Sequence, residues 1–373
     1  MKIAFCLFKY FPYGGMQRNA LRIARALRAR GHQVEFFAMQ WQGDLDPDLP
    51  VHLLPVRGLT NHTRYANFAR AFALAAQGFD GRVGCNKLPG LDLYYAADTC
   101  YHARMAKRPF WHRLSGRYRA FIAAEQAVFS PQSHTEILAI SDSEARSYQA
   151  SYGTPASRFH ALPPGIGQDR RATDAAPEQR ATLRAEFGIG ESEYLLLTIG
   201  SGFRMKGLDR SLRALAALPP MLRARTRLIA IGRDKPGLFR RLARKLGVAG
   251  ALTILDGRDD IPFFLQGADL LLHPAYYENT GSVLVEAIVA GLPVLTTSSC
   301  GFCVHVQQSG CGTVLPEPFS QAGMNQHLSR MLVSPERARW REAGIAYGQT
   351  ADLYSLGQTA AEVIETRLLA MYA

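Results

Sequence analysis

The stretch DLLLHPAYYENTGSVLVEAIVAGLPVLTT, residues 269–297, predicts a strand, a loop, a helix and a second strand in succession. Both strands are continuous apolar runs, which is typical of strands covered on two faces in a parallel sheet. The helix between them is apolar nearly all round, so we expect it to be buried. Asn279 or Thr280 is expected to cap its start and Gly291 its end, with Pro293 just beyond. The stretch therefore predicts one strand–helix–strand unit of a buried parallel sheet.

The same alternation of short aliphatic strands and helices recurs along the chain. Near the start, KIAFCLF is followed by a glycine turn, an amphipathic helix over residues 16–31 and the strand QVEFFAM. In the second half, the strands YLLLTIG, TRLIAIG and LTIL are separated by helical segments over residues 208–218 and 237–247. This pattern predicts an α/β protein with two Rossmann-like, doubly wound parallel-sheet domains that face each other across a cleft.

A segment rich in Pro, Gly and charge, which begins at LPPGIG, separates the two halves. We therefore predict an N-terminal domain over residues 1–162 and a C-terminal domain over residues 163–350. Residues 351–373 are expected to form a helix that crosses back to the N-terminal domain. Sheets of this kind bind ligands at the C-terminal ends of their strands, so we expect the functional site in the cleft.

Composition excludes several classes of protein. No apolar run approaches the ~18–20 residues of a membrane-spanning helix, and the apolar core of MKIAFCLFKY is too short for a secretory signal. Six irregularly spaced cysteines favour a reducing compartment over a disulfide framework, so we expect a cytoplasmic protein. The net charge of +12 indicates an anionic partner, such as a nucleotide, a nucleic acid or an acidic lipid surface.

Glu278 and Glu286 are the only Asp, Glu, Lys or Arg residues between positions 270 and 316. Burying an unpaired carboxylate is costly, so Glu286, inside the predicted helix, must be hydrogen-bonded, paired or bound to a ligand. The residues alone leave three interpretations open: a structural buried acid beside a solvated loop acid, a glycosidase acid–nucleophile pair, or a sugar-nucleotide site. In the third, the N–H groups at the start of the helix would seat a diphosphate between the two carboxylates.

The pattern Glu278-x7-Glu286 followed by AGLPVL resembles the E-x7-E signature of retaining glycosyltransferases of the GT-B fold. Over nearly the whole chain, further motifs are similar to those of the bacterial lipopolysaccharide core glucosyltransferases: FCLFKYFPYGGMQR, NKLPGLDLYYAADTCY, GRYR, LPPGI, KGLDRSLRALAALP, GRDD with ADLLLHPAY, and DLYSL. The resemblance implies a retaining enzyme that transfers glucose from UDP-glucose to the first heptose (heptose I) of the inner core.

The resemblance also implies roles for individual residues. Glu286 would hold the ribose hydroxyls of the nucleotide, and Glu278 would contact the donor sugar. Lys206, in another loop, would be the compensating cation that stabilises the UDP leaving group, so no metal ion or other cofactor is expected. We expect ligand hydroxyls, rather than a salt bridge, to neutralise the two acids. The donor-binding set is Gly14, Gly15, Arg204, Lys206, Arg258, Glu278, Thr280, Gly281, Ser282, Val283 and Glu286.

Several charges near this set have two interpretations. Arg204 is a second candidate cation in the loop that contains the donor-site lysine. Arg258 either contacts the uracil or is a surface charge, and Arg210 is expected on a helix surface. Asp259 and Asp260 are expected to cap a helix near the base pocket rather than to bind a metal ion.

On the acceptor side, Gly14 and Gly15 form the first turn between strand and helix, where glycine either lets the backbone approach a ligand or simply makes a tight turn. Asp98 follows an apolar strand, and we predict that it orients or deprotonates the acceptor hydroxyl, with a structural role as the equal alternative. Asp98, Glu278 and Lys206 form the predicted catalytic set, and no enzymic nucleophile is assigned.

Two positions depart from the family pattern. Asn19 stands where relatives carry a carboxylate after GGxQR, so any acid role there is lost. In CGFCVHV, His305 is displaced by one position, which leaves the donor-sugar contacts of this loop open. A zinc site made of Cys300, Cys303, His305 and Cys311 is a weaker alternative than ordinary loop thiols.

Residues 101–120 carry six Lys or Arg residues and no acid, with aromatic residues between them. Such a segment favours an anionic membrane surface, at about 1 kcal/mol per cation near the lipid, over an ordinary solvated basic face. No nucleic-acid module is recognisable, so nucleic acid is not an expected partner. We therefore predict peripheral association with the inner face of the inner membrane. The predicted patch is Arg104, Lys107, Arg108, Trp111, Arg113, Arg117 and Arg119.

The sequence thus predicts a glucosyltransferase with a UDP-sugar donor and a lipopolysaccharide inner-core acceptor. One alternative is a transferase of the same fold with another nucleotide sugar or acceptor. The other is a catalytically silent basic protein that binds membrane or nucleic acid.

Overall fold

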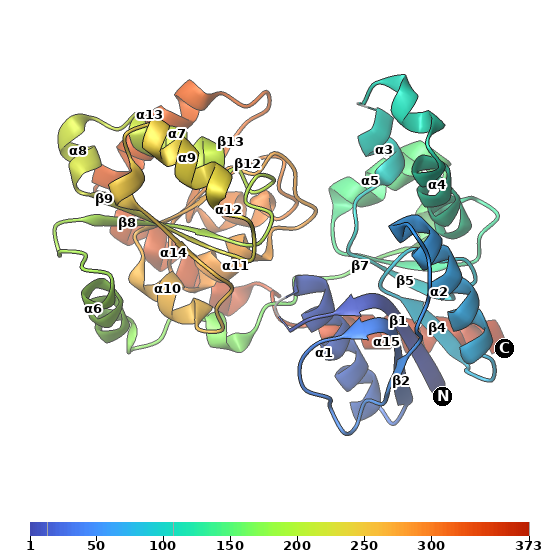
Figure 1. Ribbon diagram of the computed structural model, residues 1–373. Helices are drawn as coiled ribbons and strands as arrows, with labels where there is room; N and C mark the ends of the chain where they lie inside the picture. Colours follow the sequence, from blue (N-terminus) through green and yellow to red (C-terminus); the bar gives the residue numbers. More distant parts are fainter. Residues whose placement is uncertain (13, 107, 373) are drawn as a thin grey trace. The chain divides into compact units, whose positions relative to one another are not determined.

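The computed structural model describes residues 1–12, 14–106 and 108–372, which divide into two compact units (Figure 1). Unit 1 contains residues 1–165 and the segment that begins at Tyr354, and unit 2 contains Ile166–Leu353. Each unit has its own parallel sheet flanked by helices, as the alternating pattern predicts. Among the described residues, no helix is both long and apolar enough to span a bilayer.

Unit 1 is built on a parallel sheet in the order β3-β2-β1-β4-β5-β6-β7. Its strands are β1 (Lys2–Tyr10), β2 (Gln33–Trp41), β3 (Val51–Leu53), β4 (Gly81–Gly84), β5 (Leu93–Ala96), β6 (Glu136–Ala139) and β7 (Phe159–Ala161). Its α-helices are α1 (Gly15–Ala29), α2 (Asn61–Ala75), α3 (Tyr101–Ala106), α4 (Gly116–Phe129), α5 (Asp142–Tyr152) and α15 (Leu356–Tyr372). Helix α15 packs against α1, and Ala360, Ile364 and Leu368 join the same buried core as β1.

Unit 2 is built on a second parallel sheet, in the order β10-β9-β8-β11-β12-β13. Its strands are β8 (Tyr194–Ile199), β9 (Thr226–Ile231), β10 (Leu252–Leu255), β11 (Leu270–His273), β12 (Val294–Thr297) and β13 (Gly312–Leu315). Its α-helices are α6 (Ala176–Glu186), α7 (Leu208–Ala216), α8 (Pro220–Ala224), α9 (Gly237–Lys245), α10 (Ile261–Gly267), α11 (Ser282–Val289), α12 (Cys303–Ser309), α13 (Gln321–Val333) and α14 (Arg337–Thr350).

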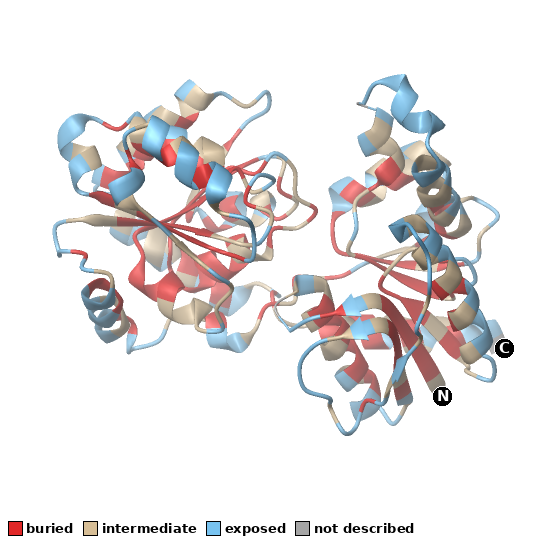
Figure 2. Cartoon of the chain, in the orientation of Figure 1, coloured by how far each residue is buried: buried red, intermediate tan, exposed pale blue. Residues whose placement is uncertain are grey.

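The sheet of unit 2 is covered on both faces, as its continuous apolar strands predict (Figure 2). Successive side chains of a strand point to opposite faces. In β8, Leu195 and Leu197 accordingly enter the core shared with α10 and α11, whereas Leu196 enters the core shared with α7, α9 and α13. The strand order reverses between β8 and β11, which makes the C-terminal ends of these two strands the topological switch point of unit 2.

The stretch at residues 269–297 forms β11, α11 and β12, and the predicted burial of the helix is confirmed. The predicted cap is wrong: neither Asn279 nor Thr280 but Gly281 precedes the helix, with a φ of +79°. That left-handed conformation costs little only for glycine, so the chain turns into the helix at this position. Gly291 follows the end of the helix with a φ of +72°, as predicted.

Candidate functional site

Glu278 lies at the centre of an ion network at the C-terminal end of β11. Its Oε2 accepts a hydrogen bond from Nε2 of His273 at 2.5 Å, and its Oε1 binds the ammonium group of Lys206. His273 is the fully buried last residue of β11, and Lys206 lies in the loop after β8. The network therefore joins the two loops that leave the switch point, where sheets of this kind bind their ligands.

This network fixes the charge of Glu278. Burial by itself would raise the pKa of the Glu278 carboxyl, but the charges and hydrogen bonds of His273 and Lys206 outweigh it and lower the pKa to about 2. Burial would lower the pKa of His273, but Glu278 raises it to about 9. At neutral pH the site thus holds a carboxylate between an imidazolium and an ammonium group.

The salt bridge corrects the expectation that ligand hydroxyls, and not a protein cation, neutralise Glu278. Lys206 does act as a compensating cation, through direct contact with Glu278. His273 was not predicted, because histidine was not counted among the charges of this stretch. The signal available in the sequence is a histidine that closes an apolar strand five residues before a lone carboxylate.

Glu286 is buried in the middle of α11, with 7% of its surface exposed. The residues between the two acids form the start of this helix. Ser282 and Val283 are its first two residues, whose N–H groups have no carbonyl partner one turn earlier in the helix. The carbonyl of Thr280 accepts a hydrogen bond from the N–H of Phe302 at 2.7 Å, which fixes the entry to the helix.

The loop after β12 braces the backbone of Glu278. The N–H of Glu278 donates to the carbonyl of Ser299 at 3.1 Å, and the N–H of Gly301 donates to the carbonyl of Glu278 at 3.2 Å. The CGFCVHV segment therefore supports the site through its backbone.

The predicted zinc alternative does not assemble. His305 Nδ1 pairs with the hydroxyl of Tyr347 at 2.8 Å, and the thiol of Cys311 points to the carbonyl of Leu292 at 3.6 Å. In the described ranges, the ligand cluster recognisable for a metal ion is instead His273, Glu278 and Cys300, with ligand atoms within 4.8 Å of one another.

This cluster is better explained as an ion network than as a metal centre. Both oxygens of Glu278 are already engaged, one by Lys206 and the other by Nε2 of His273. A divalent cation would also lie beside the positively charged Lys206.

Arg210 makes contacts that the sequence does not predict. Arg210, expected on a helix surface, donates to the carbonyls of Pro274 and Ala275 at 3.1 Å and stacks on the rings of Tyr276 and Phe319. It thus buttresses the loop that precedes Glu278. This role depends on the pairing of β8 with β11, which a helical pattern does not reveal.

Arg258 forms a two-pronged pair with Asp260, at 2.7 and 2.5 Å. Asp260 occupies the N-cap position of α10, as expected of this acidic pair, but its carboxylate binds the arginine instead of the helix N–H groups. Arg204 is exposed in the loop after β8.

Unit 1 places the predicted acceptor-side residues at the C-terminal edge of its sheet. Asp98 is exposed two residues after β5, and its carbonyl accepts a hydrogen bond from the hydroxyl of Tyr148. A Cβ atom on Gly14 would lie 1.9 Å from Gln17 Oε1, whereas Gly15 has open space around it. A side chain would therefore be crowded at the first of the two positions only.

Asn19 has a structural role that a carboxylate could not fill in the same way. Its Nδ2 donates to the hydroxyl of Tyr95 at 2.8 Å, and its Oδ1 accepts from Arg22 at 3.0 Å. An amide both donates and accepts, so the residue connects α1 to β5.

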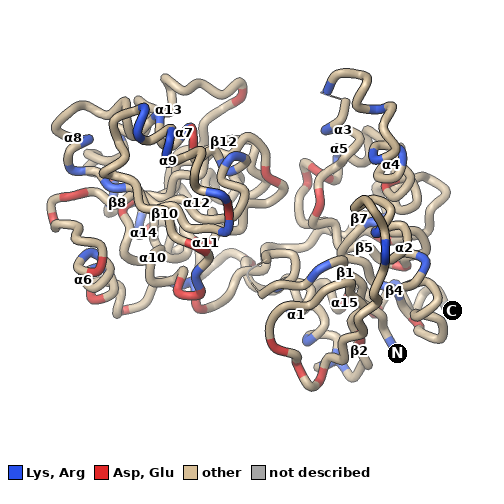
Figure 3. Tube along the Cα trace, viewed as in Figure 1, with Lys and Arg blue, Asp and Glu red and all other residues tan. Residues whose placement is uncertain are grey.

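The basic segment of unit 1 is exposed over α3, the short 3₁₀ helix η1 (Phe110–Leu114) and the start of α4 (Figure 3). Lys107 lies outside the described residues. Three apolar side chains among the cations face solvent: Phe110, Trp111 and Leu114 are 70%, 59% and 72% exposed. The exposed predicted patch residues are Arg104, Arg108, Trp111, Arg113, Arg117 and Arg119.

A buried acid that the sequence did not reveal anchors this segment. The carboxylate of Glu125, in α4, accepts hydrogen bonds from the N–H groups of Tyr101 and His102 at the start of α3, at 2.7 and 3.0 Å. It also binds the ammonium group of Lys87 and the hydroxyl of Tyr152, both at 2.6 Å. Glu125 therefore holds the start of α3, from which the exposed patch extends, in place.

Comparisons with known proteins agree with this architecture. The family model "Glycosyl transferases group 1" matches residues 179–347, and "Glycosyltransferase Family 4" matches residues 13–170. The chain is 45% identical to the lipopolysaccharide glucosyltransferase WaaG of Escherichia coli K12, over 98% of both chains. It is 28% identical to a D-inositol 3-phosphate glycosyltransferase of Salinispora arenicola, over 86% of this chain and 79% of that one.

Solved structures show the same fold. A crystal structure of WaaG, a glycosyltransferase involved in lipopolysaccharide biosynthesis, aligns with a TM-score of 0.94 at 44% identity, over 97% of this chain and 99% of that one. Anabaena Alr3699/HepE, solved with UDP and glucose, aligns with a TM-score of 0.76 at 19% identity, over 98% and 100% of the two chains. The resemblance inferred from the E-x7-E motif is thus confirmed, and the chain belongs to the GT-B glycosyltransferases, in the family that includes WaaG.

Proposed function

We propose that the protein is a retaining glucosyltransferase that transfers glucose from UDP-glucose to heptose I of the lipopolysaccharide inner core. The observation that carries the proposal is Glu278, held ionised by His273 and Lys206 at the switch point of unit 2. The 45% identity to WaaG over nearly the full length of both chains supports the substrate class.

In this proposal each residue acts through its charge and position. The Glu278 carboxylate accepts hydrogen bonds from hydroxyls of the donor glucose. Glu286 accepts hydrogen bonds from the ribose, and the N–H groups at the start of α11 hold the diphosphate. Lys206 stabilises the charge that develops on the leaving UDP, so transfer needs no metal ion. Asp98 orients the acceptor hydroxyl, and the donor and acceptor react on the same face without an enzymic nucleophile.

The test is incubation of the protein with labelled UDP-sugars and with lipopolysaccharide that ends at the inner-core heptoses. We expect label transfer from UDP-glucose in the presence of a metal chelator, with retention of the α-configuration. If label is transferred only from another UDP-sugar, that sugar nucleotide and not UDP-glucose is the donor. If neither transfer nor UDP binding is detected, the enzymatic proposal is wrong.

Replacing Glu286 with alanine is expected to weaken UDP binding about tenfold or more, because a charge-assisted hydrogen bond to the ribose is lost. Isothermal titration with UDP measures the effect. Glu286→Gln is the matched control for shape, and we expect it to retain part of the affinity. Equal UDP affinity in the wild type and the alanine variant would rule out the ribose assignment.

We further propose that the exposed basic segment of unit 1 attaches the protein to the inner face of the inner membrane. Phe110, Trp111 and Leu114 present apolar surface within a group of exposed arginines, which suits the boundary between lipid headgroups and acyl chains. A lipid-linked acceptor places the substrate at that same boundary. Attachment here would bring the acceptor side of the enzyme to its substrate.

Substitution of Arg108, Arg113, Arg117 and Arg119 with serine is expected to reduce binding to phosphatidylglycerol vesicles by up to about 10³-fold, at about 1 kcal/mol per cation. Vesicle co-sedimentation measures this binding. A matched control removes the same number of exposed cations from unit 2, namely Arg240, Arg241, Arg244 and Lys245 of α9. Equal losses in the two variants would show that the basic segment is not the specific attachment site.

A further inference from the structure

Unit 2 contains a cavity of about 360 Å³ at the end of its sheet opposite Glu278. Asp269 and Pro293, which immediately precede β11 and β12, belong to its lining. His273 and Glu278 lie at the other end of β11, about 13 Å along the strand from Asp269. The cavity is therefore separate from the proposed donor site.

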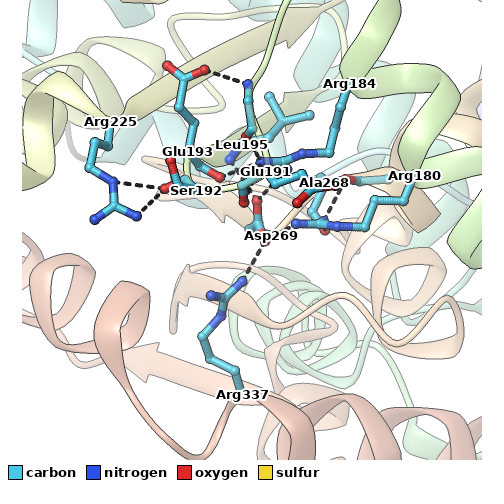
Figure 4. Close-up of polar contacts among 12 residues, drawn as sticks. Arg180, Arg184, Glu191, Ser192, Glu193, Leu195, Arg225, Ala268, Asp269 and Arg337 are labelled. Carbon is cyan, nitrogen blue, oxygen red and sulfur yellow. Dashed lines mark hydrogen bonds and ion pairs between the residues drawn. The ribbon is translucent and has the colours of Figure 1, made fainter.

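Three arginines line this cavity, but it contains one carboxylate. Oδ1 of Asp269 accepts from Arg180 at 2.8 Å and from Arg337 at 2.5 Å (Figure 4). Its Oδ2 accepts from Arg184 at 3.2 Å and from the N–H of Leu195 at 2.8 Å. Asp269 is thus fully engaged and cannot neutralise a further cation.

The third arginine of the lining, Arg341, lacks such a counter-charge. It lies one helical turn after Arg337, on the same face of α14. Among the described residues, none forms a hydrogen bond or an ion pair with the Arg341 guanidinium. Three positive charges against one negative charge leave the cavity with an excess of two.

The N-terminus of one helix adds to this positive potential. Arg337 and Ala338, the first two residues of α14, belong to the lining. The N-cap residue of α14 makes no side-chain hydrogen bond to the helix. The start of a helix carries partial positive charge and unpaired N–H groups, which favour an anion.

We propose that this cavity binds a small organic phosphate, with Arg341 as its main charged ligand. Arginine matches the geometry of a phosphate group through paired N–H donors. The remaining walls are largely apolar, with Ala268 and Pro293 among them, which suits the organic part of such a molecule. The volume is at the lower end of the range for small-molecule sites, about 300–1,000 Å³, so a metabolite-sized ligand fits. The proposal does not depend on the proposed transferase activity.

The test is titration of the full-length protein with inorganic phosphate and with glycerol 3-phosphate, at saturating UDP so that a phosphate site at α11 is already filled. We expect glycerol 3-phosphate to bind more tightly than phosphate, because its carbon chain adds van der Waals contacts with the walls that inorganic phosphate cannot make. Arg341→Gln is expected to weaken its binding about tenfold or more while UDP affinity stays unchanged. Arg240→Gln removes an exposed arginine of α9 and is expected to leave glycerol 3-phosphate binding unchanged.

The proposal is wrong if the wild type binds neither probe, or if Arg341→Gln binds glycerol 3-phosphate as the wild type does. Equal affinity for the two probes would contradict the organic part of the assignment. A lipid headgroup is the other source of a glycerol phosphate. If Arg341→Gln loses binding to phosphatidylglycerol vesicles but keeps binding to soluble glycerol 3-phosphate, the small-molecule assignment is overturned.

Discussion

Glu278→Ala is expected to reduce glucose transfer about 10²-fold or more while changing UDP affinity little. The proposed function assigns Glu278 to the donor sugar and leaves the nucleotide to Glu286 and α11. The structure gives a physical basis for this division, since His273 and Lys206 keep the Glu278 carboxylate ionised and fixed in orientation. Radiolabel transfer measures the rate, and isothermal titration with UDP measures binding.

Two controls make this result specific. Alanine leaves the buried His273 and Lys206 without their acid, so circular dichroism must show that the variant is folded. Glu278→Gln keeps the shape of the side chain but removes its charge, and we expect a similar loss of transfer. A wild-type rate of transfer in the alanine variant would show that Glu278 does not act on the donor sugar. Loss of UDP binding in a folded variant would instead assign Glu278 to nucleotide binding.

His273→Gln is expected to destabilise unit 2 by about 3 kcal/mol near pH 6, with a smaller effect toward pH 9. The folded protein raises the pKa of His273 from 6.5 to about 9, so the bound proton stabilises the fold fully below pH 6.5 and its contribution is lost as the pH rises to 9. The Glu278 pKa, lowered from 4.5 to about 2, acts in the opposite sense: its contribution is present above pH 4.5 and lost toward pH 2. Both shifts describe one contact, so the two contributions are not added.

Urea unfolding at several pH values between 6 and 9 measures this effect. His305→Gln is the matched control, because burial lowers the pKa of His305, so that a proton on this ring does not stabilise the fold. We expect the control to keep the wild-type loss of stability between pH 7 and pH 9. If the wild type is equally stable at pH 6 and pH 9, or if His273→Gln has the same pH dependence as the wild type, the charged state assigned to His273 is wrong.

The sequence was sufficient for features that depend on local pattern. Continuous apolar runs predicted the strands of unit 2, and an apolar helix with one acid predicted the burial of α11 and of Glu286. The family resemblance, rather than a local pattern, implied that Lys206 and Glu278 belong to one site. The spacing of apolar residues and the positions of glycines predict strands and helices, because each reflects the conformation of a few neighbouring residues.

Features that depend on the pairing of distant segments were not predicted. Lys206 and Glu278 are 72 residues apart and meet only because β8 and β11 are adjacent. Arg210 buttresses the loop before Glu278 for the same reason. Glu125 depends on distant segments too, since its four donors come from three other segments of unit 1.

The helix at the end of the chain sets an order of assembly during synthesis. Unit 2 is one continuous segment, whereas unit 1 takes Ala360, Ile364 and Leu368 of α15 into the core beneath β1. A ribosome that has translated residues 1–353 has synthesised every residue of unit 2 but none of α15. The core shared by β1 and α1 therefore stays incomplete until the segment made last reaches it, although domains made first usually also fold first.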